Sequence, residues 1–279
     1  MAARVAFERY LARYDAGEPR IRLKIAHTHR VAALCERIAE SLGLSREEVD
    51  LAWTCGLLHD IGRFEQVRRF GTYNDSVSVD HARLGAKILF GENTLADGVR
   101  YDGDMRHAAE QVAPDARLLR AFVPDAREDA LVHTVVETHG DFRLPARLDR
   151  RTRRFCDIVR DADKIDILHV NCNESVEAIY GVSEKQMRES PLSANVEEAF
   201  FAHRTVLRGE RTHPADLVAS HLCFVFELVF PESVRIAQTQ GDALALASRP
   251  FDNGDTATEF ARMKRHLSHW FAQPRAGLT

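Results

Sequence analysis

An adjacent imidazole and carboxylate, His59 and Asp60, end an otherwise apolar run of the sequence. Both side chains can bind a divalent metal ion. Burial of such polar groups costs free energy unless other groups satisfy them, so the pair requires partners elsewhere in the chain. The sequence offers candidates on segments that are predicted to be helical: His27, His81, His139 and the acidic stretch 161–164.

Helical periodicity separates buried histidines from exposed ones, because residues three or four positions apart share one face of a helix. His27 falls on an apolar stripe with Val31 and Ile38. His29 falls instead on a polar face with Glu36. The sequence therefore predicts that His27 points into the core and that His29 faces solvent.

His59, His81 and His139 also fall on apolar or small-residue stripes, each in its own helix. The stripe of His59 includes Gly56, which would let a neighbouring helix approach closely. One such histidine is commonly a packed core residue, but four in different helices favour a metal centre. Neutral imidazole is a common ligand of transition metals, and a buried cluster without a metal becomes costly on protonation.

Three carboxylates of one later helix are further candidates. The apolar face of this helix is centred on Phe155 and Ile158, with Asp161 and Asp163 on either side of it and Asp166 nearer its centre. Periodicity does not decide which of the three carboxylates would meet a metal.

The composition limits the functional class. The chain has 279 residues and a formal net charge of −4, which argues against broad nucleic-acid binding. An arginine-rich stretch over 147–154 fits either a solvated helix face or a rim that attracts an anionic substrate. The five cysteines form no Cys-x-x-Cys motif, which is typical of reduced thiols in a cytoplasmic protein. No signal peptide and no membrane-spanning run of about 20 apolar residues is visible.

The chain reads as one all-α domain over residues 1–279, with helices throughout. Helices are predicted over 21–42, from Ser45 to Gly62, and over 78–90, 127–139 and 151–169. A loop is predicted over 66–77, and the polar segment 91–124 is expected to be an insertion or a lid with one helical stretch. Residues 170–279 are predicted to continue as helices separated at prolines. The oligomeric state is left open, with a homo-oligomer allowed.

Four segments together resemble the HD superfamily of metal-dependent phosphohydrolases. They are His27-Thr-His-Arg-Val, Leu58-His59-Asp60-Ile-Gly62, His81-Ala-x-x-Gly85 and Asp161-Ala-Asp163-Lys164. The resemblance covers roughly residues 20–170 and implies an HD-type helical bundle. Residues 171–279 would then be a helical extension of this metal-site core.

The resemblance also implies roles for individual residues. His27, His59, Asp60 and Asp163 would bind a first divalent metal, and His81 and His139 match the additional histidines of two-metal members. Asp60 would then lie between the metals. A one-metal site stays open, since in one-metal members a histidine near His81 instead serves as an acid or orients phosphate. The mixed nitrogen and oxygen ligands suit manganese, iron, cobalt, nickel, zinc or magnesium. Lys164 and Arg63 would assist catalysis by contacting a substrate phosphate, although a surface role remains open for each.

The function that follows is hydrolysis of a small phosphorylated substrate, such as a nucleotide or another phosphoester, by a metal-activated water. Two alternatives stay open. The same six ligands could hold a di-iron centre that oxidises its substrate, as in some HD proteins. A non-catalytic nucleotide-sensing module is the other alternative, and the intact ligand set argues against it.

Overall fold

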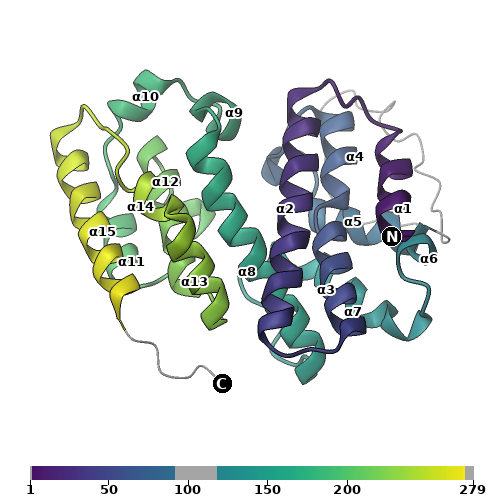
Figure 1. The fold of residues 1–279 in the computed structure, drawn as a ribbon. Coiled ribbons are helices and arrows are strands. Elements are labelled where there is room, and N and C mark those ends of the chain that lie inside the picture. The colour runs from purple at the N-terminus through teal and green to yellow at the C-terminus, as the bar shows by residue number, and fades with distance from the viewer. Residues whose placement is uncertain (1, 92–117, 274–279) are drawn as a thin grey trace. The chain divides into compact units, whose positions relative to one another are not determined.

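The computed structural model describes residues 2–91 and 118–273, and every regular element in these two stretches is a helix (Figure 1). The all-α prediction is confirmed. The chain divides into two compact units, residues 1–160 and 161–279. That residues 1–279 form a single helical domain stays a prediction. The expected lid over 91–124 lies largely outside the described residues.

The first unit holds the histidines of interest. Its elements are α1 (Ala2–Leu11), α2 (Pro19–Ser41), α3 (Arg46–Leu58), α4 (Ile61–Phe70), η1 (Asp75–Val77), α5 (His81–Phe90), α6 (Leu118–Phe122), η2 (Ala126–Glu128), α7 (Asp129–Thr138) and the first half of α8 (Arg150–Asn173). Helix α2 packs along α3 and α4, while α5 packs against α4 and α7 (Figure 1). These contacts bring the ends of α3, α5 and α7 towards the middle of α2.

The close approach of α2 and α3 depends on Gly56. A Cβ at this position would lie 2.9 Å from the Cα of Ala32 and 2.8 Å from the Sγ of Cys35, both on α2. Such distances are too short for any larger side chain. The expectation that this stripe lets a neighbouring helix approach is therefore confirmed, and it explains how His27 and His59 come within reach of each other.

Two predictions about the chain near the pair His59-Asp60 are wrong. The predicted helix from Ser45 to Gly62 is interrupted, because α3 ends at Leu58 and α4 begins at Ile61. The predicted loop over 66–77 begins only at Gly71, whose positive φ of 62° ends α4. Helix α4 continues this far because Gln66 and Val67 are buried and because Glu65 pairs with Arg68 and Arg69 one turn later.

The remaining predicted helices of this unit are confirmed with small shifts at their ends. Helix α5 begins at His81, three residues later than expected, because the Asp80 carboxylate accepts a hydrogen bond from the Arg83 N–H and caps the helix. Ser45 caps α3 in the same way by accepting from the Glu48 N–H. Helix α7 ends beside His139, as predicted.

The second unit begins within α8. Its other elements are α9 (Val176–Tyr180), α10 (Glu184–Arg188), α11 (Ala194–Phe201), η3 (Arg208–Glu210), α12 (Pro214–Leu222), η4 (Cys223–Glu227), α13 (Pro231–Gln240), α14 (Asp242–Leu246) and α15 (Gly254–Ala272). Pro214 and Pro231 are the first residues of α12 and α13, a position where the missing N–H costs nothing. The buried rings of Phe200 and Phe260 contribute to the core of this unit.

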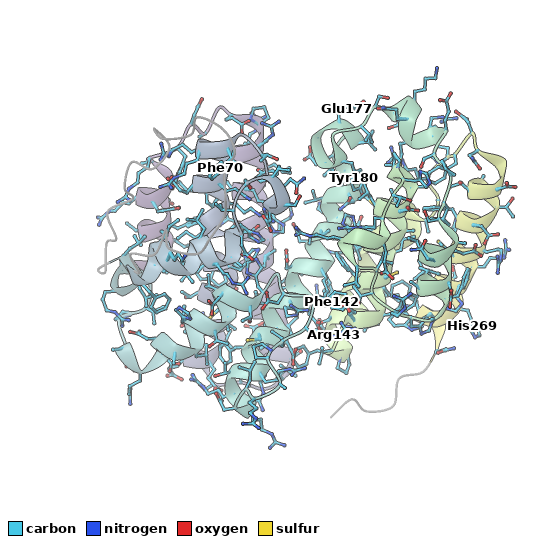
Figure 2. All side chains as sticks on the ribbon, turned by 180° about the vertical axis from the view of Figure 1, so that it is seen from behind. Phe70, Phe142, Arg143, Glu177, Tyr180 and His269 are labelled. Carbon is cyan, nitrogen blue, oxygen red and sulfur yellow. The ribbon has the colours of Figure 1, made fainter. Side chains whose placement is uncertain are left out.

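All five cysteines are free thiols, in agreement with the prediction of reduced thiols, and four of them are buried. Among the residues that the structure describes, no helix combines the length and the apolar character needed to cross a membrane. The side chains are drawn in Figure 2, where Phe142 and Arg143 mark the segment between α7 and α8. The Arg143 guanidinium lies over the exposed Phe142 ring, 4.4 Å from its centroid.

Candidate metal centre

Asp60 occupies the break between α3 and α4, and its carboxylate is not used to cap a helix. The backbone there has φ −101° and ψ 17°, and the side chain makes no capping hydrogen bond to α4. The residue is 3% exposed. The helix break therefore leaves a buried carboxylate available to side chains from neighbouring helices.

One oxygen of this carboxylate, Oδ2, faces the first pair of histidines. The Nε2 atoms of His27 and His59 lie 3.4 Å and 3.6 Å from Oδ2. The same two nitrogen atoms are 3.3 Å apart. His27 is 2% exposed and His59 is fully buried, whereas His29 is exposed beside Phe7, so the predicted contrast between His27 and His29 is confirmed.

The other oxygen, Oδ1, faces the second pair of histidines. The Nε2 atoms of His81 and His139 lie 3.3 Å and 3.6 Å from Oδ1, and they are 3.0 Å from each other. Both residues are buried, as predicted. The two carboxylate oxygens thus each meet one pair of imidazole nitrogens.

Hydrogen bonds on the far side of the rings define their tautomers. His59 Nδ1 lies 2.7 Å from the Gly56 carbonyl oxygen, and His139 Nδ1 lies 2.8 Å from the Val136 carbonyl oxygen. A carbonyl oxygen only accepts, so each Nδ1 carries the hydrogen. In the neutral ring, Nε2 then presents its lone pair to Asp60, which is the arrangement typical of metal-bound histidine.

Helix α8 fixes the chain around His139. The Arg160 guanidinium donates from Nη1 to the carbonyl oxygens of His139 at 3.0 Å and Asp141 at 2.6 Å. These carbonyls follow the end of α7, where backbone oxygens lack helical partners. Arg160 therefore holds the segment that carries His139.

The charges around Asp60 favour its ionised form. Burial opposes ionisation, but the Lys24 ammonium and the neighbouring imidazoles outweigh burial and hold the pKa of Asp60 well below its usual range. For His81 the surroundings favour the neutral form of the ring. Burial and the nearby Arg63 charge lower the pKa of His81 to about 4, so its ring is neutral near pH 7.

Two positively charged side chains lie beside Asp60. The Nζ of Lys24 lies 2.6 Å from Asp60 Oδ2, and Lys24 was missed in the sequence although it lies one turn before His27 on the same face of α2. The Nε of Arg63, a predicted substrate contact, lies 3.5 Å from Asp60 Oδ1. The Arg63 guanidinium also pairs with Asp75, a second residue that the sequence analysis missed.

The predicted residues Asp163 and Lys164 belong to the second unit, on α8. Lys164 Nζ lies 2.8 Å from Glu227 Oε2. The neighbouring Asp161 is fully buried and accepts hydrogen bonds from the backbone N–H groups of Val229 and Phe230. Asp161 therefore has a structural role within this unit, and we no longer consider it a candidate metal ligand beside Asp163. The ligand role of Asp163 stays a prediction.

The donor set fits a divalent cation. The residues His59, Asp60 and His139 each offer a ligand atom within 4.8 Å of the others. Imidazole nitrogen and carboxylate oxygen are the ligands that manganese, iron, cobalt, nickel and zinc share. In the neutral tautomers, the Nε2 atoms of His81 and His139 both carry lone pairs, so their close approach requires a cation or a proton beside them.

Comparison with known proteins agrees with this geometry. The family model described as HD domain matches residues 25–171, more than half of the 279-residue chain. The match covers the four buried histidines, Asp60 and the part of α8 that carries Asp163. No curated protein and no solved structure matches the chain. HD domains bind divalent metals and are mostly metal-dependent phosphohydrolases. On the length of this match and the motifs it contains, the chain belongs to the HD domain family.

Proposed function

We propose that this protein is a phosphohydrolase that cleaves a small phosphoester with the help of two divalent cations bound by Asp60 and the four buried histidines. The proposal rests on one observation, which is that the two carboxylate oxygens of Asp60 face two different pairs of histidines. Oδ2 faces His27 and His59, and Oδ1 faces His81 and His139. A carboxylate placed in this way is suited to bridge two cations.

Each cation would have its own ligands in addition to Asp60. His27 and His59 would hold the first, with Asp163 as the further ligand that the family motif implies. His81 and His139 would hold the second. When bound, such cations acidify a water molecule and neutralise the charge that develops on the phosphoryl oxygens.

Two lysine side chains, Lys24 and Lys164, would bind the anionic part of the substrate. The charge of Lys24 beside Asp60, and its 17% exposed side chain, suit it to bind an anionic group at the edge of the cluster. Lys24 also lies over the Tyr73 ring, 5.4 Å from its centroid, which limits where the ammonium can move. Lys164 is proposed, from the family motif, as a second contact for the substrate phosphate.

The test is metal-dependent hydrolysis by the purified 279-residue chain, measured as release of the leaving alcohol or phosphate, because a cleaved phosphodiester yields an alcohol and a phosphomonoester. Phosphomonoesters, phosphodiesters and nucleotides should be screened after removal of metal and reloading with Mn²⁺ or Co²⁺. We expect release that depends on added metal and is lost in His27→Ala. The matched control is His29→Ala, which removes an exposed imidazole from the same helix and should leave release unchanged. Absence of release from all three substrate classes would contradict the proposal.

A di-iron oxygenase is the second candidate, because the same six ligands suit two iron ions. The two functions differ in their need for oxygen. A hydrolase retains its turnover under anaerobic conditions and with redox-inert cations. Turnover that requires both O₂ and two bound iron ions would replace the hydrolase proposal with this one.

A further inference from the structure

We propose that Asp75 is a positioning residue that orients His81 towards the second cation, and that Arg63 acts by holding Asp75. This inference rests on the proposed two-metal site. Asp75 Oδ2 accepts a hydrogen bond from His81 Nδ1 at 2.8 Å. Because a carboxylate only accepts here, the hydrogen of the neutral His81 ring lies on Nδ1 and the lone pair of Nε2 faces Asp60.

His81 needs this partner because of its position in α5. His59 and His139 follow the ends of α3 and α7, and each uses the carbonyl oxygen three residues earlier, from Gly56 or Val136. His81 is instead the first residue of its helix, so no preceding turn of α5 supplies a carbonyl oxygen. A side chain from outside the helix takes the place of that carbonyl.

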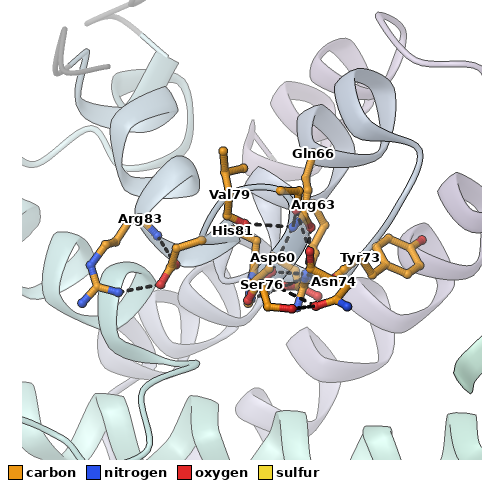
Figure 3. A network of polar contacts seen from close by, with 12 residues as sticks. Asp60, Arg63, Gln66, Tyr73, Asn74, Ser76, Val79, His81 and Arg83 are labelled. Atoms are coloured by element: carbon orange, nitrogen blue, oxygen red, sulfur yellow. Dashed lines mark hydrogen bonds and ion pairs between the residues drawn. The ribbon is translucent and has the colours of Figure 1, made fainter. Parts of the chain in front are cut away.

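Two side chains of α4 hold Asp75 in place, Arg63 and Gln66, and both are labelled in Figure 3. The second oxygen of Asp75, Oδ1, accepts from Arg63 Nη1 at 2.7 Å and from Gln66 Nε2 at 2.9 Å. Gln66 is fully buried in α4 and its amide also lies 2.9 Å from the Val79 carbonyl oxygen. The segment between α4 and α5 is therefore tied to α4 on both sides of Asp75.

The Arg63 guanidinium is directed at this segment. Its Nη1 donates to Asp75 Oδ1, to the Tyr73 carbonyl oxygen at 2.6 Å and to Gln66 Oε1 at 2.8 Å. Its side chain is 13% exposed. A guanidinium engaged in this way stabilises the position of Asp75, which is a different role from the direct substrate contact that the family resemblance implies.

The carboxylate has a chemical consequence for the second cation. A negative partner on Nδ1 raises the electron density at Nε2, and loss of such a partner weakens metal affinity by about 10- to 100-fold in metal–histidine–carboxylate arrangements. His59 and His139 have neutral carbonyl partners instead. The effect of Asp75 should therefore be confined to the cation held by His81 and His139.

The experiment is calorimetric titration of Mn²⁺ into the metal-free, full-length protein and its variants. We expect two binding events in the unchanged protein. In Asp75→Ala, one event should weaken by about 10- to 100-fold while the other keeps its affinity. Asp75→Asn keeps the shape and one acceptor oxygen, so its loss should be smaller. Ser76→Ala, an exposed neighbour in the same segment, is the matched control and should keep both affinities.

Weakening of only one of the two Mn²⁺-binding events distinguishes a positioning role of Asp75 from a general loss of structure in the variant. Equal weakening of both events in Asp75→Ala, or no weakening of either, would overturn the inference. So would the binding of fewer than two Mn²⁺ ions by the unchanged protein. If two ions bind, Asp75→Ala weakens one, and no phosphoester is hydrolysed, the inference stands and the proposed function fails.

Discussion

The Nε2 atoms of His81 and His139 lie 3.0 Å apart, and both face the same carboxylate oxygen of Asp60. The two histidines come from the start of α5 and the end of α7. The packing of α5 against both α4 and α7 brings them together. The geometry of the centre therefore depends on how closely these helices approach, which leads to the first prediction.

Replacement of Gly62 by Ala should force α4 and α5 apart. A Cβ there would overlap the carbonyl oxygen of His81 and would lie 2.6 Å from the backbone nitrogen of Gly85. Backbone atoms cannot rotate away, so we expect a loss of at least about 1–3 kcal/mol in the free energy of unfolding. Urea denaturation of the metal-free protein measures it. Gly254→Ala is the control, since its Cβ would meet nothing within 4 Å and should change stability by less than about 0.5 kcal/mol.

The close packing of α4 against α5 at Gly62 should also affect metal binding. Because the His81 backbone would move in Gly62→Ala, the variant should bind Mn²⁺ more weakly than Gly254→Ala. Equal unfolding free energies for Gly62→Ala and the unchanged protein would contradict the packing described here.

Lys164 and Glu227 offer a test of the proposed substrate contact. Their side chains form a 2.8 Å ion pair within the second unit, with exposures of 12% and 16%. Lys164→Gln and Glu227→Gln both break this pair and should lose similar stability. Only Lys164→Gln should raise KM for the phosphoester, by about tenfold, because it removes one charged contact to phosphate worth roughly 1.4 kcal/mol. Steady-state kinetics of both variants measure the split, and an equal KM would assign Lys164 to structure alone.

His221 should make the protein less stable in mild acid. Burial, together with the Arg211 charge, lowers the pKa of His221 to about 3. An unfolded histidine has a pKa near 6.5, so below that pH the unfolded chain binds a proton that the folded chain does not. The contribution is fully favourable above pH 6.5 and is lost as the pH falls, by about 2 kcal/mol at pH 5.

His221→Gln should remove this part of the pH dependence. Urea denaturation at pH 7 and pH 5 in a chelating buffer measures it, with metal kept out of the equilibrium. The stability difference between the two pH values should shrink by about 2 kcal/mol in His221→Gln. It should stay unchanged in His269→Gln, which alters an exposed imidazole of α15. An unchanged difference in His221→Gln would show that the ring is not the titrating group.

The sequence allowed the buried histidines to be predicted because each lies on an apolar stripe of a helix. His27, His59, His81 and His139 are all buried in the structure. Their ligand roles, like those of Asp163 and Lys164, stay proposals. The interruption at His59 and Asp60 was not predicted, because local helical periodicity continues through residues that tertiary contacts hold in another conformation.

Lys24 and Asp75 were missed for different reasons. Lys24 precedes His27 by three residues, so helical spacing carried a signal for it that was overlooked. Asp75 lies in the segment between two helices, where side-chain direction has no period. Its contact with His81 depends on the path of that segment, which Arg63 and Gln66 determine through tertiary hydrogen bonds.

The most direct test of the two-metal account is the metal content of the purified, Mn²⁺-loaded protein after dialysis, measured beside Asp60→Ala. We expect two ions per chain in the unchanged protein and fewer than one in Asp60→Ala, because both histidine pairs share that carboxylate. Two ions retained by Asp60→Ala, or fewer than two bound by the unchanged protein, would contradict this account.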